Sequence, residues 1–120
     1  KVEYVEDNAT SMNLRDGGVA ANVMFFLLHE LPHDLKGQAL NEAGRMLATG
    51  GKLFLAEFHR PQLWVLRALS WTYFKVFEPL GLALWDTHDP LNYLESTGAW
   101  TCERTTYFFG NFQIITATKK

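Results

Sequence analysis

Two apolar runs, separated by a helical pattern and a double glycine, constrain the fold more than any other feature of the sequence. Positions 20–28 read AANVMFFLL, and positions 52–58 read KLFLAEF. An almost continuous apolar run bounded by turn residues is typical of a strand buried on both faces. Between positions 35 and 47 apolar residues recur at helical spacing, and Gly50-Gly51 then ends the helix. The order strand, helix, strand predicts a βαβ unit with parallel strands and a right-handed crossover.

The second half of the chain predicts two helices and a hairpin. Positions 63–85 form a long apolar stretch in which four polar residues make one narrow stripe, so we expect a helix covered on most sides and ended or kinked at Pro79. Asp89-Pro90 is typical of the cap and first residue of a short helix that runs through Glu95. Positions 100–109 and 112–118 alternate as two antiparallel strands joined by the two-residue turn Gly110-Asn111.

The start of the chain also carries a strand pattern. In Lys1–Val5, Val2 and Tyr4 alternate with charged residues, which indicates a half-buried strand already under way. A polar loop follows it.

Composition limits the classes of function. The chain has 120 residues, of which 48% are hydrophobic, and a net charge of −2, so we expect one packed domain and no nucleic-acid partner. Cys102 is the single cysteine, which excludes an intrachain disulfide and fits a cytoplasmic protein. The apolar stretch at 63–85 contains too many polar residues for a transmembrane segment, which leaves peripheral contact with a membrane as an alternative.

Polar residues follow both strands of the predicted βαβ unit. His29-Glu30 ends the first run, and Glu57 and His59 end the second. Because ligands bind at the carboxyl edge of open α/β sheets, these residues converge where chemistry would take place. His29-Glu30 is the candidate pair for substrate positioning or proton transfer. Two alternatives remain: Glu30 helps to cap the next helix, or the four side chains gather a divalent metal.

Several stretches resemble one enzyme family. The segment LNEAGRMLATGGKLFLAEFHRP is similar to the class I S-adenosylmethionine-dependent methyltransferases, and Asp7-Asn8-Ala9 resembles a turn of their ubiquinone and menaquinone members. The likeness to rhodoquinone-biosynthesis methyltransferase-like proteins is closer and rests on FFLLHELP (25–32), HRP (59–61), FEPLGLALW (77–85) and YFFGNFQIITATK (107–119). The resemblance implies a truncated Rossmann-like α/β fold, with a mostly parallel sheet that ends in an antiparallel hairpin.

The resemblance also implies roles for individual residues. It suggests cofactor-binding, catalytic and substrate-contacting groups, and no metal. These are Asn8, Ala9, Phe25 and Phe26 for the cofactor S-adenosylmethionine, His29 and Glu30 for catalysis, and His59 and Tyr107 for the substrate.

The sequence lacks the glycine-rich GxGxG turn of that family and its acidic ribose partner. We therefore interpret residues 1–120 as the C-terminal half of a methyltransferase-like domain and expect weak S-adenosylmethionine binding or none. Two functions follow as hypotheses: methyl transfer to a quinone or other lipophilic ring, or a non-catalytic module that self-associates and binds a small molecule or a protein. Uncovered apolar surface predicts a homodimer through Trp64, Trp71 and Phe74, through the strand edge at 23–28, or through both.

Overall fold

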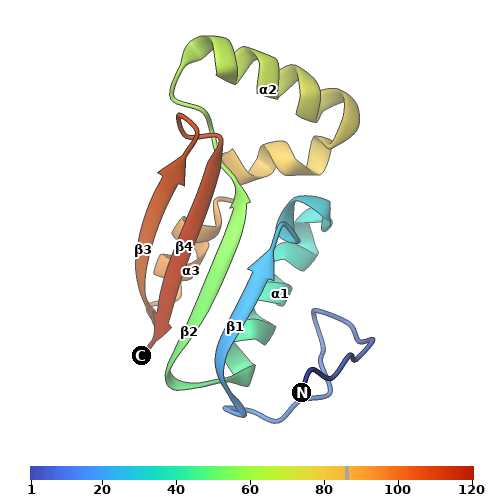
Figure 1. Cartoon of the computed structure of the whole chain (residues 1–120), viewed down its shortest axis with the longest axis vertical. Helices are drawn as coiled ribbons and strands as arrows, with labels where there is room; N and C mark the ends of the chain where they lie inside the picture. Colours follow the sequence, from blue (N-terminus) through green and yellow to red (C-terminus); the bar gives the residue numbers. More distant parts are fainter. Residues whose placement is uncertain (86) are drawn as a thin grey trace.

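The computed structural model describes residues 1–85 and 87–120 as a four-stranded sheet with helices on one face and a helical cap at one end (Figure 1). The elements are β1 (Val19–Phe25), the 3₁₀ helix η1 (Leu28–Glu30), α1 (His33–Met46), β2 (Leu47–Phe58), α2 (Trp64–Phe77), the 3₁₀ helix η2 (Pro79–Trp85), α3 (Pro90–Ser96), β3 (Trp100–Tyr107) and β4 (Phe112–Lys119).

The order of the strands is β1-β2-β4-β3. Strands β1 and β2 are parallel and are joined through α1, which confirms the predicted βαβ unit. Strand β4 runs antiparallel to both β2 and β3, which confirms the terminal hairpin. The α/β fold class is therefore as predicted, but only one pair of strands is parallel, so the sheet is mixed rather than mostly parallel.

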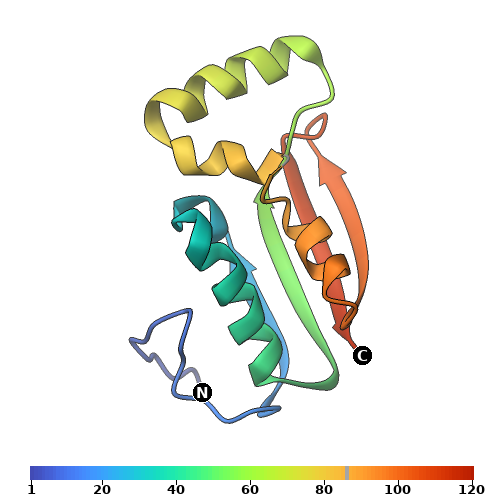
Figure 2. The same ribbon diagram turned by 180° about the vertical axis from the view of Figure 1, so that it is seen from behind.

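Helices α1 and α3 cover one face of the sheet, and the hydrophobic core lies between them and the strands (Figure 2). Leu53, Leu55 and Ile115 point into this layer and are fully buried. Leu40 of α1 and Leu94 of α3 meet them from the helical side. Each such side chain contributes about 1.5–3 kcal/mol of transfer free energy when buried.

The opposite face of the sheet is open. Val23 and Phe25 of β1 are 68% and 72% exposed, and Phe54 and Ile114 beside them are also exposed. The expectation that positions 20–28 form a strand buried on both faces is therefore wrong, because none of the described elements packs on this side. The predicted homodimer stays a prediction, and the unpaired edge of β1 is one surface available for it.

The cap lies beyond the carboxyl ends of β1 and β2, where α2 and η2 run one above the other (Figure 1). Helix α2 ends before Pro79, as predicted, and η2 begins at that residue. Asp89 caps α3 by accepting a hydrogen bond from the backbone N–H of Leu91. The prediction that α2 is covered on most sides is wrong, because Phe74 is its only buried residue. Phe74 is thus unavailable for the predicted dimer contact.

The turn between β3 and β4 differs from the predicted two-residue turn. Tyr107 pairs with Phe112, so the connection spans positions 108–111. Phe108 and Phe109 adopt positive φ angles of 52° and 56°, which are uncommon for residues other than glycine. The alternating pattern therefore extends the first strand two residues too far, while the second strand begins at Phe112 as predicted.

The predicted strand at Lys1–Val5 does not form. Val2 is 73% exposed and Tyr4 is 93% exposed, and no described strand lies beside them. Alternation indicates which face a strand would bury, but a strand forms only where backbone partners exist.

The polar loop after this segment is held to α1 by two charged side chains. The Glu42 carboxylate accepts a hydrogen bond from the backbone N–H of Met12 at 2.7 Å, and Arg45 donates to the carbonyls of Met12 and Leu14. Arg45 also pairs with Glu42 and with Asp16. These bonds lower the pKa of Glu42 to about 2, with the Arg45 side chain as the largest cause.

We expect acid to release this loop. Because the pKa of Glu42 is lower in the folded chain than in the unfolded one, its stabilisation is present above pH 4.5 and is lost as the pH falls towards about 2. Glu42→Ala, which removes the acceptor, should therefore expose the Met12 amide to fast hydrogen exchange even at neutral pH. Equal protection of that amide in the variant and the wild type would contradict this role of Glu42.

Candidate functional site

A buried carboxylate lies at the carboxyl end of β2. Side chains alternate along a strand, and Glu57 continues the inward row of Leu53 and Leu55, so its carboxylate enters the core side of the sheet. The chain following β1 turns into η1 and places His29 beside it. Glu57 is 0% exposed and His29 is 6% exposed.

The His29 ring lies between two carboxylates. Its Nδ1 is 2.9 Å from Oε1 of Glu57, and its Nε2 is 3.1 Å from Oε2 of Glu78, which ends α2. The Glu78 side chain is 29% exposed, so the row of three groups leads from the core to the surface. A carboxylate bound to one imidazole nitrogen fixes the orientation of the ring and leaves the other nitrogen for proton transfer.

Besides the His29 ring, two backbone N–H groups stabilise the charged form of Glu57. The N–H groups of Phe58 and His29 donate to its two oxygens at 3.0 and 3.3 Å. Burial nevertheless raises the pKa of Glu57, and the hydrogen bonds and the nearby His29 offset only part of that effect. The charged form of Glu57 is therefore less favoured than that of an exposed glutamate.

Aromatic rings enclose this pair. The Phe58 ring lies 4.9 Å from the His29 ring, 4.8 Å from Phe74 and 5.1 Å from Phe26, measured between centroids. Phe26 has a positive φ of 50° and donates its backbone N–H to the carbonyl of Ala56. This backbone turn brings its side chain against the end of β2.

A hollow of about 320 Å³ opens beside the aromatic rings, between α2 and the hairpin turn. Its lining is mainly apolar, with two polar side chains. The residues are Phe58, Leu69, Ser70, Tyr73, Phe74, Asn111 and Phe112. Because Phe58 borders the hollow and contacts His29, the row of Glu57, His29 and Glu78 and an apolar cavity meet at one ring.

The other residues predicted for this edge have different surroundings. Glu30 is on the surface, 3.9 Å from Nε2 of His29. The Nδ1 of His59 hydrogen-bonds to the carbonyl of Gly110 at 3.0 Å, so its ring supports the hairpin turn. Tyr107 is 46% exposed at the end of β3. Within residues 1–85 and 87–120, no three His, Cys, Asp or Glu side chains are grouped to hold a metal ion.

Two of the predicted cofactor-binding residues line a common hollow. Ala9 and Phe25 border a cavity of about 310 Å³ between the N-terminal loop, β1 and α1. Met12 and Val23 add apolar walls. The side-chain carbonyl of Asn8 already accepts hydrogen bonds from Thr10, while Phe26 belongs to the aromatic group around His29.

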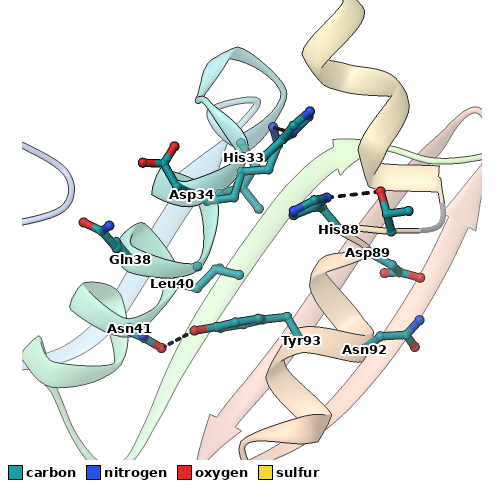
Figure 3. Close-up of a pocket in the computed structure, with 13 residues that line it drawn as sticks. His33, Asp34, Gln38, Leu40, Asn41, His88, Asp89, Asn92 and Tyr93 are labelled. Carbon is teal, nitrogen blue, oxygen red and sulfur yellow. Dashed lines mark hydrogen bonds between the residues drawn. The ribbon is translucent and has the colours of Figure 1, made fainter.

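A larger, polar hollow of about 560 Å³ lies between α1 and α3, on the helical side of the molecule (Figure 3). His33 and His88 stack there with centroids 4.7 Å apart, and Tyr93 donates a hydrogen bond to Asn41. Buried Lys36 donates to the carbonyl of Leu31 at 2.6 Å, which fixes the turn between η1 and α1. None of the predicted site residues lines this hollow, so its contribution to the candidate site is indirect.

Comparison with known protein families decides the identity of the fold. The model of the ubiE/COQ5 methyltransferase family matches residues 1–106. The chain belongs to the ubiE/COQ5 methyltransferase family. A search of curated proteins gave no match.

Solved structures with the same fold are S-adenosylmethionine-dependent methyltransferases. One from Thermotoga maritima has 20% identity and a TM-score of 0.72, and the alignment covers 97% of this chain and 63% of that chain. One from Methanosarcina mazei has 18% identity, a TM-score of 0.66 and coverages of 99% and 68%. One from Aquifex aeolicus has 16% identity, a TM-score of 0.66 and coverages of 98% and 55%. This chain thus spans between about half and two thirds of the length of these structures.

The sequence patterns do not reveal Glu78 as a partner of His29. Glu78 was part of the polar stripe at positions 63–85, and a stripe on a helix indicates a face but no distant contact. The sequence suggests a role for Glu57 only as a ligand of the alternative metal site. The signal that could have identified it is a charged residue in the inward register of an apolar strand, since such a group needs a buried partner.

The raised pKa of Glu57 predicts a particular pH dependence of stability. Because its folded pKa lies above the unfolded value of 4.5, Glu57 favours folding most below that pH and less as the pH rises through the folded pKa. Glu57→Gln carries no charge to bury. The free energy of unfolding of the variant minus that of the wild type should therefore increase from pH 4.5 towards neutral pH, as measured by urea denaturation.

Glu42→Gln is the matched control for this experiment. Glu42 has a lowered pKa, so the free energy of unfolding of Glu42→Gln minus that of the wild type should fall slightly just above pH 4.5 and then stay flat, and should not rise. A flat or falling difference for Glu57→Gln would show that the His29 pair, and not burial, dominates at Glu57.

Proposed function

We propose that the carboxyl edge of this sheet transfers a methyl group to a hydroxyl of a quinol or another lipophilic ring, and that the Glu78–His29 pair takes up the proton. The observation that carries the proposal is the position of the His29 ring, with Glu57 at 2.9 Å on one nitrogen and Glu78 at 3.1 Å on the other. On this proposal residues 1–120 supply the C-terminal half of a methyltransferase domain.

The substrate class is inferred from the hollow beside the row of Glu57, His29 and Glu78. Its lining of Phe58, Tyr73, Phe74 and Phe112 favours a flat, apolar ring, and offset or edge-on ring contacts would hold it. The Phe58 side chain lies between that ring and His29, so a hydroxyl on the ring would reach past Phe58 to the Glu78–His29 pair. Tyr107 and His59, at the same end of the hairpin, would border the substrate on the outer side.

The residues present fit only part of S-adenosylmethionine. The apolar hollow bordered by Ala9, Met12 and Phe25 has room for a flat heterocycle, while the sequence holds no glycine-rich turn for the rest of the molecule. When bound, S-adenosylmethionine supplies an electrophilic methyl group. Ala9 and Phe25 would hold its adenine side, while Phe26 would orient the substrate side.

The chain's own residues account for the proton. As the substrate oxygen gains the methyl group, it loses its proton to the Glu78–His29 pair, and the partly exposed Glu78 passes that proton to water. Glu57 keeps the ring oriented through Nδ1. Positioning of this kind and proton transfer by a fixed side chain are each worth large factors in rate, with about 10²–10⁴ for the proton transfer.

We expect His29→Gln to lower kcat for methyl transfer to a short-chain hydroxylated benzoquinol by about a hundredfold, with KM little changed. The assay follows labelled methyl groups at saturating S-adenosylmethionine. His33→Gln, an exposed histidine on α1, is the control and should keep wild-type turnover. Equal turnover in His29→Gln and the wild type would remove His29 from the mechanism.

We further expect residues 1–120 to bind S-adenosylmethionine weakly. Without contacts to the methionine and ribose parts of the molecule, the binding free energy should be weaker by several kcal/mol, and each 1.4 kcal/mol raises Kd about tenfold. Calorimetric titration measures this directly. A micromolar Kd would contradict the expectation, whereas complete absence of binding would favour the non-catalytic alternative.

A further inference from the structure

Helix α2 exposes most of its apolar side chains. Surface helices normally bury an apolar stripe, but in α2 only Phe74 is buried. Two polar side chains lie against the protein: Arg67 donates to the carbonyls of Pro61 and Gln62, and Ser70 donates to the side chain of Asn111.

Exposed apolar side chains of α2 form one surface, which we call the α2 face. Its members recur at helical spacing and are between 47% and 76% exposed. They are Trp64, Val65, Leu69, Tyr73 and Val76. Two of them, Leu69 and Tyr73, also border the hollow beside Phe58. An exposed apolar surface of this kind marks an interaction site.

Basic side chains border the α2 face, and acidic ones are absent from it. Arg60 precedes the helix, and Lys75 lies 4.4 Å from the ring centroid of Trp71. Positions 58–77 contain no Asp or Glu. Two copies of this face would bring like charges together, whereas a negatively charged surface would complement them.

A hollow of about 600 Å³ adjoins the α2 face and combines tryptophan with arginine. It is lined by Arg60, Trp64, Arg67, Trp71 and Trp85, together with Ala68 and Thr72. The indole Nε1 of Trp85 is buried and has no hydrogen-bond partner among the described residues. Guanidinium groups are donors that a phosphate group can use.

We propose that the α2 face lies on the surface of a membrane that contains anionic phospholipids. Val65, Leu69 and Val76 enter the boundary of the acyl chains, and the tryptophans take the level of the headgroups. The hollow with Arg60 and Arg67 receives a lipid phosphate. No helix in the described part of the chain is long and apolar enough to cross a bilayer, so the contact is peripheral. The inference does not depend on the proposed methyl transfer.

The test is flotation of the chain with lipid vesicles. We expect residues 1–120 to float with vesicles that contain phosphatidylglycerol at least about tenfold better than with pure phosphatidylcholine, since each basic residue near such a surface contributes about 1 kcal/mol. Added salt should reduce the bound fraction. Tryptophan emission should shift to shorter wavelength on binding.

Substitutions on the α2 face separate this surface from the rest of the molecule. Leu69→Glu and Val76→Glu should each lower the bound fraction about tenfold, since both side chains are exposed and the fold does not depend on them. Val2→Glu, an equally exposed apolar residue at the other end of the molecule, is the control and should bind as the wild type does.

Three results would overturn the proposal. They are no flotation with anionic vesicles, equal flotation of Leu69→Glu and the wild type, and equal binding to neutral and anionic vesicles. Light scattering gives a further check: a dimer that Leu69→Glu dissociates would assign the α2 face to a second copy of the chain and would also overturn it.

Discussion

The hydrogen-bonded pair of Glu57 and His29 is the constraint on which the edge of this fold depends. A carboxylate in the inward row of β2 would cost several kcal/mol if it were left alone, so the chain after β1 must bring donors to it. The backbone and the ring of His29 both do so, which fixes η1 at the end of β2. Gly81 of η2 then passes so close that a Cβ there would lie 2.9 Å from the Phe74 ring and 3.4 Å from the Cβ of His29. One buried acid thus ties a strand, a 3₁₀ helix and the cap together.

The distribution of apolar surface explains why chemistry and binding gather at this end. Helices α1 and α3 cover the core face of the sheet, while the face with Val23 and Phe54 and the outward side of α2 stay exposed. The row of Glu57, His29 and Glu78 leads from the core to the surface. The apolar hollow lies beside it, between α2 and the hairpin turn. If α2 rests on a membrane, a lipophilic ring reaches that hollow from the bilayer side of the cap.

Local patterns in the sequence predicted the elements whose partners lie close in the chain. The βαβ unit, the Asp89 cap and the two hairpin strands follow from periodicity and turn chemistry, and the structure confirms them. Three predictions are wrong: a strand at Lys1–Val5, burial of β1 on both faces, and a covered α2. Each of them depends on which elements pack beside the segment, and the pattern within the segment does not contain that information. The contact between His29 and Glu78 joins positions on different elements, so no spacing rule could reveal it. Family membership was foreseen from the stretches at 25–32, 59–61, 77–85 and 107–119, and the family model confirms it.

The central claim, that Glu57 fixes the His29 ring for proton transfer, is tested most directly by nuclear magnetic resonance on the chain with isotope-labelled histidine. The account predicts that one imidazole proton, on Nδ1 of His29, exchanges slowly with water, and that Glu57→Gln abolishes this slow exchange. The rings of His33 and His88, which lie on the hollow between α1 and α3, should be unaffected by that substitution. A His29 ring whose protons exchange as fast as those of His33, with or without Glu57, would contradict the account.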